Sequence, residues 1–198
     1  LKTLDVDIDV VGRSEKSSKE FSKKSRWFVH SEGIESYINK NIKPPKYAIV
    51  AVNENQLSDV TISLINYGVK NILLEKPGAL NYSDLLNIKN TSVLNSCNVY
   101  LGYNRRFYES VKKCREFLSK NTGPVNVHFE FTEWSHAIDF NHYTKGELEK
   151  FFLCNSSHVV DLVFHLFGLP EVLNSYTTGS LDWHPSASIF SGSGKTKE

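Results

Sequence analysis

The sequence contains no methionine, only six prolines and only three cysteines among its 198 residues. The cysteines Cys97, Cys114 and Cys154 are widely spaced and include no Cys-x-x-Cys pair. This pattern excludes a zinc ribbon and a disulfide framework, and it predicts free thiols in a reducing compartment. No apolar run approaches the roughly 20 residues of a membrane-spanning helix. We therefore expect a cytoplasmic protein without a membrane partner.

An excess of charge of one sign is also missing. The 23 basic and 22 acidic residues leave a net charge of +1. Net charge therefore gives no reason to expect nucleic acid as a partner. With 40% hydrophobic, 12% aromatic and 23% charged residues, the composition is that of a globular protein and excludes a disordered chain. At roughly 100–200 residues per domain, the length allows one domain or two small ones.

Hydrophobic periodicity predicts alternating strands and helices in the first half of the chain. The predicted strands span residues 6–11, 47–52, 69–74 and 98–102, and the predicted helices span 14–24, 33–41, 55–67 and 82–89. Residues 47–52 form an unbroken apolar run, which is typical of a strand buried on both faces of a parallel sheet. Alternation at these spacings predicts an α/β fold with a Rossmann-like, doubly wound parallel sheet.

The pattern changes after Gly102. The later predicted helices span residues 107–119 and 155–167, and the later predicted strands span 124–133, 172–178 and 187–190. We place a domain boundary near Tyr103. It separates a Rossmann-like domain over residues 1–103 from an α+β domain with a largely antiparallel sheet over residues 104–198.

Both domains are expected to be incomplete. A Rossmann fold opens with a strand and a Gly-x-Gly-x-x-Gly turn that holds a diphosphate. The sequence contains no such motif, and residues 1–4 resemble the end of the helix that would follow it. Residues 186–196 resemble the first turn of an antiparallel sheet whose other strands are missing. We therefore expect this chain to be the middle of a longer two-domain protein.

Polar residues follow the predicted parallel strands, at the sheet edge where ligands of such folds bind. These clusters are Gly12-Arg13-Ser14, Asn53-Glu54, Glu75-Lys76-Pro77 and Asn104-Arg105-Arg106. Each cluster taken alone could be an ordinary polar loop. Their common position at one edge predicts a ligand site there.

Several of these segments resemble the Gfo/Idh/MocA oxidoreductases. The run Val50-Ala51-Val52-Asn53 precedes a helix, and the next strand ends in Glu75-Lys76-Pro77, a motif that the family carries at this strand end. The resemblance continues in Gly102-Tyr103-Asn104-Arg105-Arg106-Phe107 and in Ser157-His158-Val159-Val160-Asp161, which is similar to the His-x-x-Asp helix of the family. It covers essentially the whole chain. It implies an oxidoreductase that uses NAD or NADP and acts on the CH–OH group of a sugar, nucleotide sugar or polyol.

The resemblance also implies roles for individual residues. Lys76 would lie beside the nicotinamide and hydrogen-bond the reacting hydroxyl, with its ammonium form disfavoured by the cationic ring. His158 would take the hydroxyl proton. The expected cofactor-binding residues are Arg13, Ser14, Asn53, Glu75, Lys76, Pro77, Asn104 and Arg105. The expected substrate-binding residues are Lys76, Asn155, Ser156, His158 and Asp161, of which Asp161 is expected to orient or pack rather than react.

Two positions bear on the ligands. Many members of the family carry an acid four residues before the histidine, where this chain has Cys154. A thiol cannot replace a carboxylate as an acceptor for sugar hydroxyls, so either Asn155 or Ser156 takes over that contact or the substrate differs. Arg13 and Ser14 stand where NAD-binding Rossmann folds carry an acid, which favours NADP, although Arg13 could also stack on adenine.

Other signals are weaker. The segment Gly192-Ser193-Gly194-Lys195-Thr196 resembles the end of a Walker A loop, but Ile189 stands where the first glycine is needed, and a hairpin turn is the better interpretation. The histidine and aspartate sets at 136, 139 and 142 and at 158, 161 and 165 lack the i, i+4 histidine pair of a zinc helix, so we expect no metal.

Two functional hypotheses remain open at this stage. One is the oxidoreductase, expected to form a homo-oligomer at full length through the open sheet of its second domain. The other is a non-catalytic nucleotide-binding or scaffolding protein with the same fold. The presence of both Lys76 and His158 favours the enzyme. The segment alone is expected to bind the cofactor poorly, because it lacks the glycine-rich turn.

Overall fold

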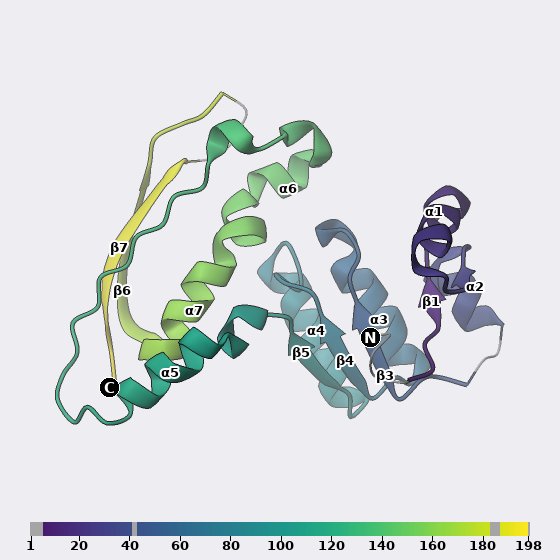
Figure 1. Cartoon of the computed structure of the whole chain (residues 1–198), viewed down its shortest axis with the longest axis horizontal. Helices are drawn as coiled ribbons and strands as arrows, with labels where there is room; N and C mark the ends of the chain where they lie inside the picture. The colour runs from purple at the N-terminus through teal and green to yellow at the C-terminus, as the bar shows by residue number, and fades with distance from the viewer. Residues whose placement is uncertain (1–5, 41–42, 183–186, 198) are drawn as a thin grey trace.

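The computed structural model describes residues 6–40, 43–182 and 187–197. Figure 1 shows three groups of elements along the longest axis of the molecule. The first contains β1, β2, α1 and α2, the second contains β3–β5 with α3 and α4, and the third contains α5–α7 with β6 and β7. The expected end of a helix at residues 1–4 and the residue 186 lie outside the described residues.

The first group is a short parallel pair with two helices. Strand β1 (Val10–Val11) pairs in parallel with β2 (Val29–His30), followed by α2 (Gly33–Asn39). Helix α1 (Glu15–Ser25) begins where the sequence predicts, because the Ser14 hydroxyl accepts a hydrogen bond from the Ser17 N–H at 3.3 Å. The strand is shorter than the predicted span of residues 6–11.

The second group is a three-stranded parallel sheet in the order β3-β4-β5. Its strands are β3 (Tyr47–Val50), β4 (Asn71–Leu74) and β5 (Asn98–Leu101), with α3 (Leu57–Tyr67) and α4 (Tyr82–Leu94) between them. The short 3-10 helix η2 (Glu54–Gln56) leads into α3. The core of this group lies between the sheet and the two helices, and it is formed by Val50, Leu57, Leu64, Ile65, Val69, Ile72, Leu74, Ala79, Ile88 and Cys97.

The prediction that residues 47–52 are buried on both faces is wrong. Val50 is 2% exposed, whereas Tyr47 is 65% and Ile49 is 56% exposed. Because side chains alternate along a strand, these two residues point away from the core that Val50 enters. The strands β1 and β2 also form a sheet of their own instead of continuing β3-β4-β5.

The third group joins helices to an antiparallel pair of strands. It contains η3 (Asn104–Phe107), α5 (Glu109–Leu118), the short helices η4 (Ser135–Ala137) and η5 (Phe140–His142), α6 (Lys145–Glu149), the π-helix η6 (Phe152–Ser156), α7 (Ser157–Phe167), β6 (Pro170–Thr178) and β7 (Ile189–Thr196). Strands β6 and β7 pair antiparallel. Residues 124–133, predicted as a strand, form no ladder with another strand.

The glycines near the end of the chain lie inside β7, so the predicted hairpin turn there is wrong. Gly192 faces Ser175 and Gly194 faces Leu173 in the register with β6. A Cβ atom at Gly192 would lie 2.6 Å from the Asn174 carbonyl oxygen. These glycines therefore allow close approach of two backbones rather than a change of direction.

The predicted fold class is confirmed: the chain is α/β, with parallel sheets followed by a separate antiparallel sheet. Within the residues that the structure describes, no helix is long and apolar enough to cross a membrane.

Candidate functional site

The carboxyl ends of β4 and β5 lie next to each other and carry two of the predicted polar clusters. The hydrogen bonds of the sheet continue one residue beyond each strand: the Glu75 N–H donates to the Val50 carbonyl at 2.9 Å, and the Gly102 N–H donates to the Leu74 carbonyl at 2.7 Å. A Cβ at residue 102 would lie 3.2 Å from Oε2 of Glu75. Glycine at this position therefore leaves room for the Glu75 carboxylate at the sheet edge.

A tight turn after β4 positions Lys76. The Gly78 N–H donates to the Glu75 carbonyl at 3.1 Å, and Gly78 has φ +86°, a conformation that glycine adopts without strain. A Cβ at residue 78 would lie 2.6 Å from Cδ2 of Leu101. The half-buried Lys76 leaves this turn and its Nζ donates a hydrogen bond to the backbone carbonyl of Cys154. The end of β4 is thereby joined to the π-helix η6.

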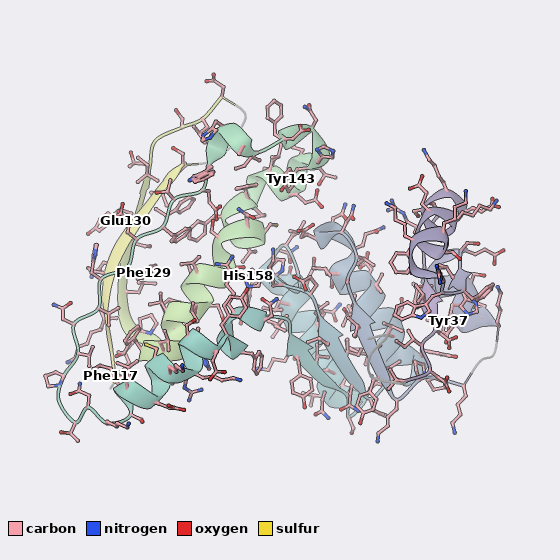
Figure 2. All side chains as sticks on the ribbon, viewed as in Figure 1. Tyr37, Phe117, Phe129, Glu130, Tyr143 and His158 are labelled. Atoms are coloured by element: carbon pink, nitrogen blue, oxygen red, sulfur yellow. The ribbon has the colours of Figure 1, made fainter. Side chains whose placement is uncertain are left out.

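His158 approaches the same strand ends from the start of α7. Figure 2 shows it on the side of α7 that faces the three-stranded sheet. Its ring meets the Tyr103 ring edge-on, with centroids 5.7 Å apart and an interplanar angle of 85°. Tyr103 follows β5 directly, so the two rings connect the end of β5 with α7. A π-helix precedes α7, and such wide turns occur often at functional sites.

The surroundings of His158 favour its neutral form. Burial lowers the pKa of this histidine, and the positive charges of Lys76 and Arg105 lower it further. The carboxylates of Glu75 and Asp161 act in the opposite direction without cancelling the shift. Its Nδ1 atom is buried and has no hydrogen-bond partner among the described residues. Because Nδ1 is shielded from solvent, a ligand of this ring would have to bind at Nε2.

Asp161 forms a two-pronged ion pair with Arg106. Nε of Arg106 donates to Oδ2 of Asp161 at 2.7 Å, and Nη2 donates to Oδ1. The Asp161 side chain is only 12% exposed. The Arg106 guanidinium also lies 5.7 Å from the centroid of the Tyr103 ring. Both oxygens of the Asp161 carboxylate are thus engaged by a residue of η3.

The residues before His158 use their backbone and hydroxyl groups. The Cys154 thiol is buried, and its pKa is raised to about 11, mainly by burial and then by the charge of Glu54. At neutral pH this thiol is uncharged, and its carbonyl is the group that binds Lys76. The buried Ser156 donates to Oε1 of Glu133 at 3.2 Å. Asn155 between them is half-buried.

The remaining predicted residues lie at the ends of other elements or beside Lys76 and Arg105. Arg13 donates to Oε1 of Gln56 at 3.2 Å, which joins the end of β1 to η2, and Ser14 caps α1. Asn53 and Asn104 are exposed at the ends of β3 and β5, and Pro77 is buried.

The structure brings together five of the residues predicted from the sequence. The charges of Glu75, Lys76, Arg105 and Asp161 all act on the pKa of His158. Sequence reasoning missed the roles of Tyr103, Arg106, Glu54, Gln56 and Glu133. Tyr103 and Arg106 belong to the motif that drew attention to Asn104 and Arg105, so the signal was present. Nothing in the sequence distinguishes Glu133 from other surface acids.

The described residues contain no group of three or more histidine, cysteine, aspartate or glutamate side chains that could hold a metal ion. In the set at 136, 139 and 142, Nδ1 of His142 lies 2.9 Å from Oδ2 of Asp139.

Solved structures with the same fold include several dehydrogenases. The WlbA dehydrogenase of Chromobacterium violaceum, in complex with NADH and UDP-GlcNAcA, has a TM-score of 0.73 and 15% identity, and the match covers 96% of this chain and 56% of that one. The WlbA dehydrogenase of Bordetella pertussis, in complex with the same two ligands, has a TM-score of 0.74 and 11% identity over 96% and 59% of the two chains. An inositol dehydrogenase homologue of Azotobacter vinelandii, complexed with NAD+, has a TM-score of 0.75 and 12% identity over 92% and 53%.

These likenesses concern the fold. No protein-family model matches the sequence, and no curated protein matches it. The chain spans just over half the length of the dehydrogenases that it resembles, at 56% of the first of them. It shares with them a Rossmann-like α/β fold.

Proposed function

We propose that this chain belongs to an oxidoreductase of the Gfo/Idh/MocA type, which transfers hydride between a nicotinamide cofactor and the CH–OH carbon of a sugar, nucleotide sugar or polyol. The observation that carries the proposal is the convergence of Lys76 and His158 at the ends of two parallel strands. The ends of parallel strands are where α/β folds bind nucleotides. Cofactors bound to three of the similar structures, NADH or NAD+, support the same class of ligand.

The residues at this edge fit a nicotinamide cofactor. Polar groups extend from Arg13 at one end to Lys76 and His158 at the other. Between them lies η2, whose Gln56 binds Arg13 and whose Glu54 influences Cys154. His158 Nδ1 and Ser157 Oγ are buried polar atoms without partners among the described residues. We assign the nicotinamide end to Glu75, Lys76, Pro77, Asn104 and Arg105, the adenosine end to Arg13 and Ser14, and the span between them to Asn53.

A bound nicotinamide ring supplies the two-electron acceptor or donor for the substrate carbon. The chain's own residues handle the substrate oxygen and its proton. Lys76 donates a hydrogen bond to that oxygen after releasing the Cys154 carbonyl. His158, neutral at pH 7 because its pKa is lowered, accepts the hydroxyl proton at Nε2 during oxidation and returns it during reduction. Asp161 does not take part directly, because Arg106 occupies both of its oxygens.

The adenosine end favours NADP. Arg13 is exposed and held at the end of β1 by Gln56, and Ser14 stands at the N-terminus of the 11-residue helix α1. A guanidinium and a helix N-terminus suit a 2′-phosphate, whereas an acid at this place suits the free ribose hydroxyls of NAD. We further propose that the longer protein is cytoplasmic and assembles as a homo-oligomer through the exposed sheet β6-β7.

The substrate side differs from a site with an acid at position 154. The uncharged, buried Cys154 thiol offers no carboxylate to substrate hydroxyls. Asn155 is half-buried, and no hydrogen bond joins its amide to another described residue, whereas the Ser156 hydroxyl is directed to Glu133. We propose that Asn155 is the polar group that replaces the acid.

Nicotinamide fluorescence tests the proposal. NADPH or NADH is titrated into the purified chain up to about 5 mM, a range in which a millimolar site fills. We expect a saturable change, stronger for NADPH, that is lost in Lys76→Ala and kept in Lys89→Ala, an exposed lysine of α4. No saturable change with either cofactor, or an equal response of Lys76→Ala and the unmodified chain, overturns the proposal.

A further inference from the structure

A continuous set of contacts leads from Asp161 to His158 by way of η3. Asp161 binds Arg106 through two hydrogen bonds, Arg106 lies over the Tyr103 ring, and the Tyr103 ring meets the His158 ring edge-on. Asp161 and His158 lie three residues apart on one helix, so they project from the same face of α7. Arg106 and Tyr103 lie three residues apart at the end of β5. Two pairs of side chains therefore fasten α7 to the end of β5.

A second side-chain contact to α7 differs from the Arg106–Asp161 pair in its position and in its burial. Nη1 of Arg115, in α5, lies 3.3 Å from Nε2 of His165, in the last turn of α7, and both side chains are at the surface. This pair joins α5 to the far end of α7, two helical turns from His158. It does not touch Tyr103. The Arg106–Asp161 pair, by contrast, has a carboxylate that is only 12% exposed and a guanidinium that touches Tyr103.

We propose that Arg106 and Asp161 are a positioning pair, which holds the start of α7 against the end of β5 and thereby places the His158 imidazole edge-on to Tyr103 and opposite Lys76. The importance of this placement for catalysis rests on the proposed function. The placement itself does not rest on the proposed function. Its only consequence to be tested is that the His158 ring loses its fixed position when the Arg106–Asp161 pair is broken.

The shapes of the two charged groups explain how the Arg106–Asp161 pair fixes the position of the His158 ring. A guanidinium presents two parallel N–H groups in a planar fork, which fits one orientation of a carboxylate. A lysine at position 106 would keep the positive charge but not the fork, so it would not fix the rotation of α7 about its own axis. Removing the Arg106 guanidinium would also leave the Asp161 carboxylate, which is only 12% exposed, without its partner. Both changes are expected to loosen the helix start more than its far end.

The charged groups around His158 come from three elements. Glu75 and Lys76 approach from the turn after β4, Arg105 approaches from η3, and Asp161 lies on α7 itself. Movement of α7 would change the distances of the first three from the imidazole at once. The position of the ring and its titration should therefore change together in a variant that breaks the pair.

The experiment uses nuclear Overhauser effects between the Tyr103 and His158 rings in the 198-residue chain. The rings are close enough in the structure to give such an effect. In Asp161→Asn and in Arg106→Lys, we expect the intensity to fall at least about threefold, with the His158 ring resonances moving toward those of a solvent-exposed histidine. Arg115→Lys, the matched control, should keep both the intensity and the resonances. Unchanged intensity in Asp161→Asn and Arg106→Lys overturns the proposal.

A further variant covers the case in which the single changes prevent folding. In Arg106→Met combined with Asp161→Leu, two apolar side chains replace the ion pair, a kind of change that proteins often tolerate. We expect this variant to fold but to lose the ring-to-ring effect, because apolar contact does not fix the rotation of the helix. A retained effect overturns the proposal.

No step of this test uses the cofactor. If the Overhauser effect behaves as expected but no cofactor binds, the positioning pair stands and the proposed function fails. If the cofactor binds through Lys76 but the Overhauser effect is unchanged in the variants, the proposed function stands and the positioning pair fails.

Discussion

The Lys76 ammonium donates a hydrogen bond to the backbone carbonyl of Cys154, which lies 78 residues further along the chain. This contact joins the turn after β4 to the π-helix before α7. It brings the lysine of the Glu-Lys-Pro motif to the backbone of Cys154, four residues before His158. The two residues assigned to the proton chemistry are thus held by elements from opposite halves of the sequence.

The Lys76 hydrogen bond should contribute to stability. Replacing Lys76 by methionine removes a charged donor from a half-buried carbonyl and should lower the free energy of unfolding by about 1–2 kcal/mol. Urea denaturation followed by circular dichroism measures the change. Lys89→Met, at an exposed position of α4, should stay within about 0.5 kcal/mol of the unmodified chain. Equal effects of the two substitutions would show that the Lys76 contact does not form in solution.

The pKa of His158 should lie below its ordinary value of 6.5, because burial and the charges of Lys76 and Arg105 disfavour the imidazolium. The folded state then binds its proton less readily than the unfolded state, so the stabilising contribution is present above pH 6.5 and is lost as the pH falls through the folded pKa. Titration of the His158 ring protons by NMR measures the value. Lys76→Met should raise it, and a value at or above 6.5 in the unmodified chain would contradict the electrostatics described above.

The three cysteines should differ in reactivity. The Cys154 thiol is buried with a pKa of about 11, and the Cys97 thiol is also buried with a raised pKa, whereas Cys114 is half-exposed on α5. Because the thiolate is the nucleophile, Cys154 should react with iodoacetamide at pH 8 at least about tenfold more slowly than Cys114. Mass spectrometry of the peptides after timed labelling gives the two rates. Labelling of Cys154 as fast as Cys114 would mean that η6 does not cover this thiol.

The turn after β4 depends on Gly78. Alanine there would combine a φ of +86° with a Cβ only 2.6 Å from Cδ2 of Leu101, and should cost about 1–3 kcal/mol of stability. Gly146, in α6, offers a matched control because a Cβ there meets nothing within 4 Å. Gly146→Ala should be neutral or stabilise by up to about 1 kcal/mol, because alanine is the better helix former. Urea midpoints compare the two, and equal values would place the turn elsewhere.

Much of the fold follows from local patterns in the sequence. Apolar runs separated by helical segments predicted β3, β4, β5 and α3. Ser14 and Gly68 predicted helix ends that the structure also has. These signals are local, so one sequence is enough to read them. The burial of a strand face depends on what packs against it, which is why the exposure of Tyr47 and Ile49 could not be foreseen. The alternation in residues 124–133 likewise indicates a strand, yet no strand in the described part of the chain pairs with it.

The candidate site, like the fold, could be predicted from the sequence only in part. Lys76 and His158 stand in recognisable motifs. Lys76 and Tyr103 follow neighbouring parallel strands, whose ends meet at one edge of the sheet, and His158 reaches that edge from the start of α7. The contacts that hold them do not follow from residue type. Cys154 accepts the Lys76 hydrogen bond through its backbone carbonyl, a group that every residue has. Arg106, and not the neighbouring Arg105, binds Asp161 because of the way η3 and α7 are oriented. Such choices depend on side-chain directions that only the folded chain defines.

The most direct test of the central claim is an amide chemical-shift map of the chain on titration with NADPH. We expect the largest shifts at the ends of β4 and β5, in residues 75–78 and 102–105, and at His158, with smaller shifts at Arg13 and Ser14. Lys76→Ala should abolish those at the strand ends. Shifts confined to other parts of the chain, or none at all at about 5 mM NADPH, would contradict a nicotinamide site built on Lys76 and His158.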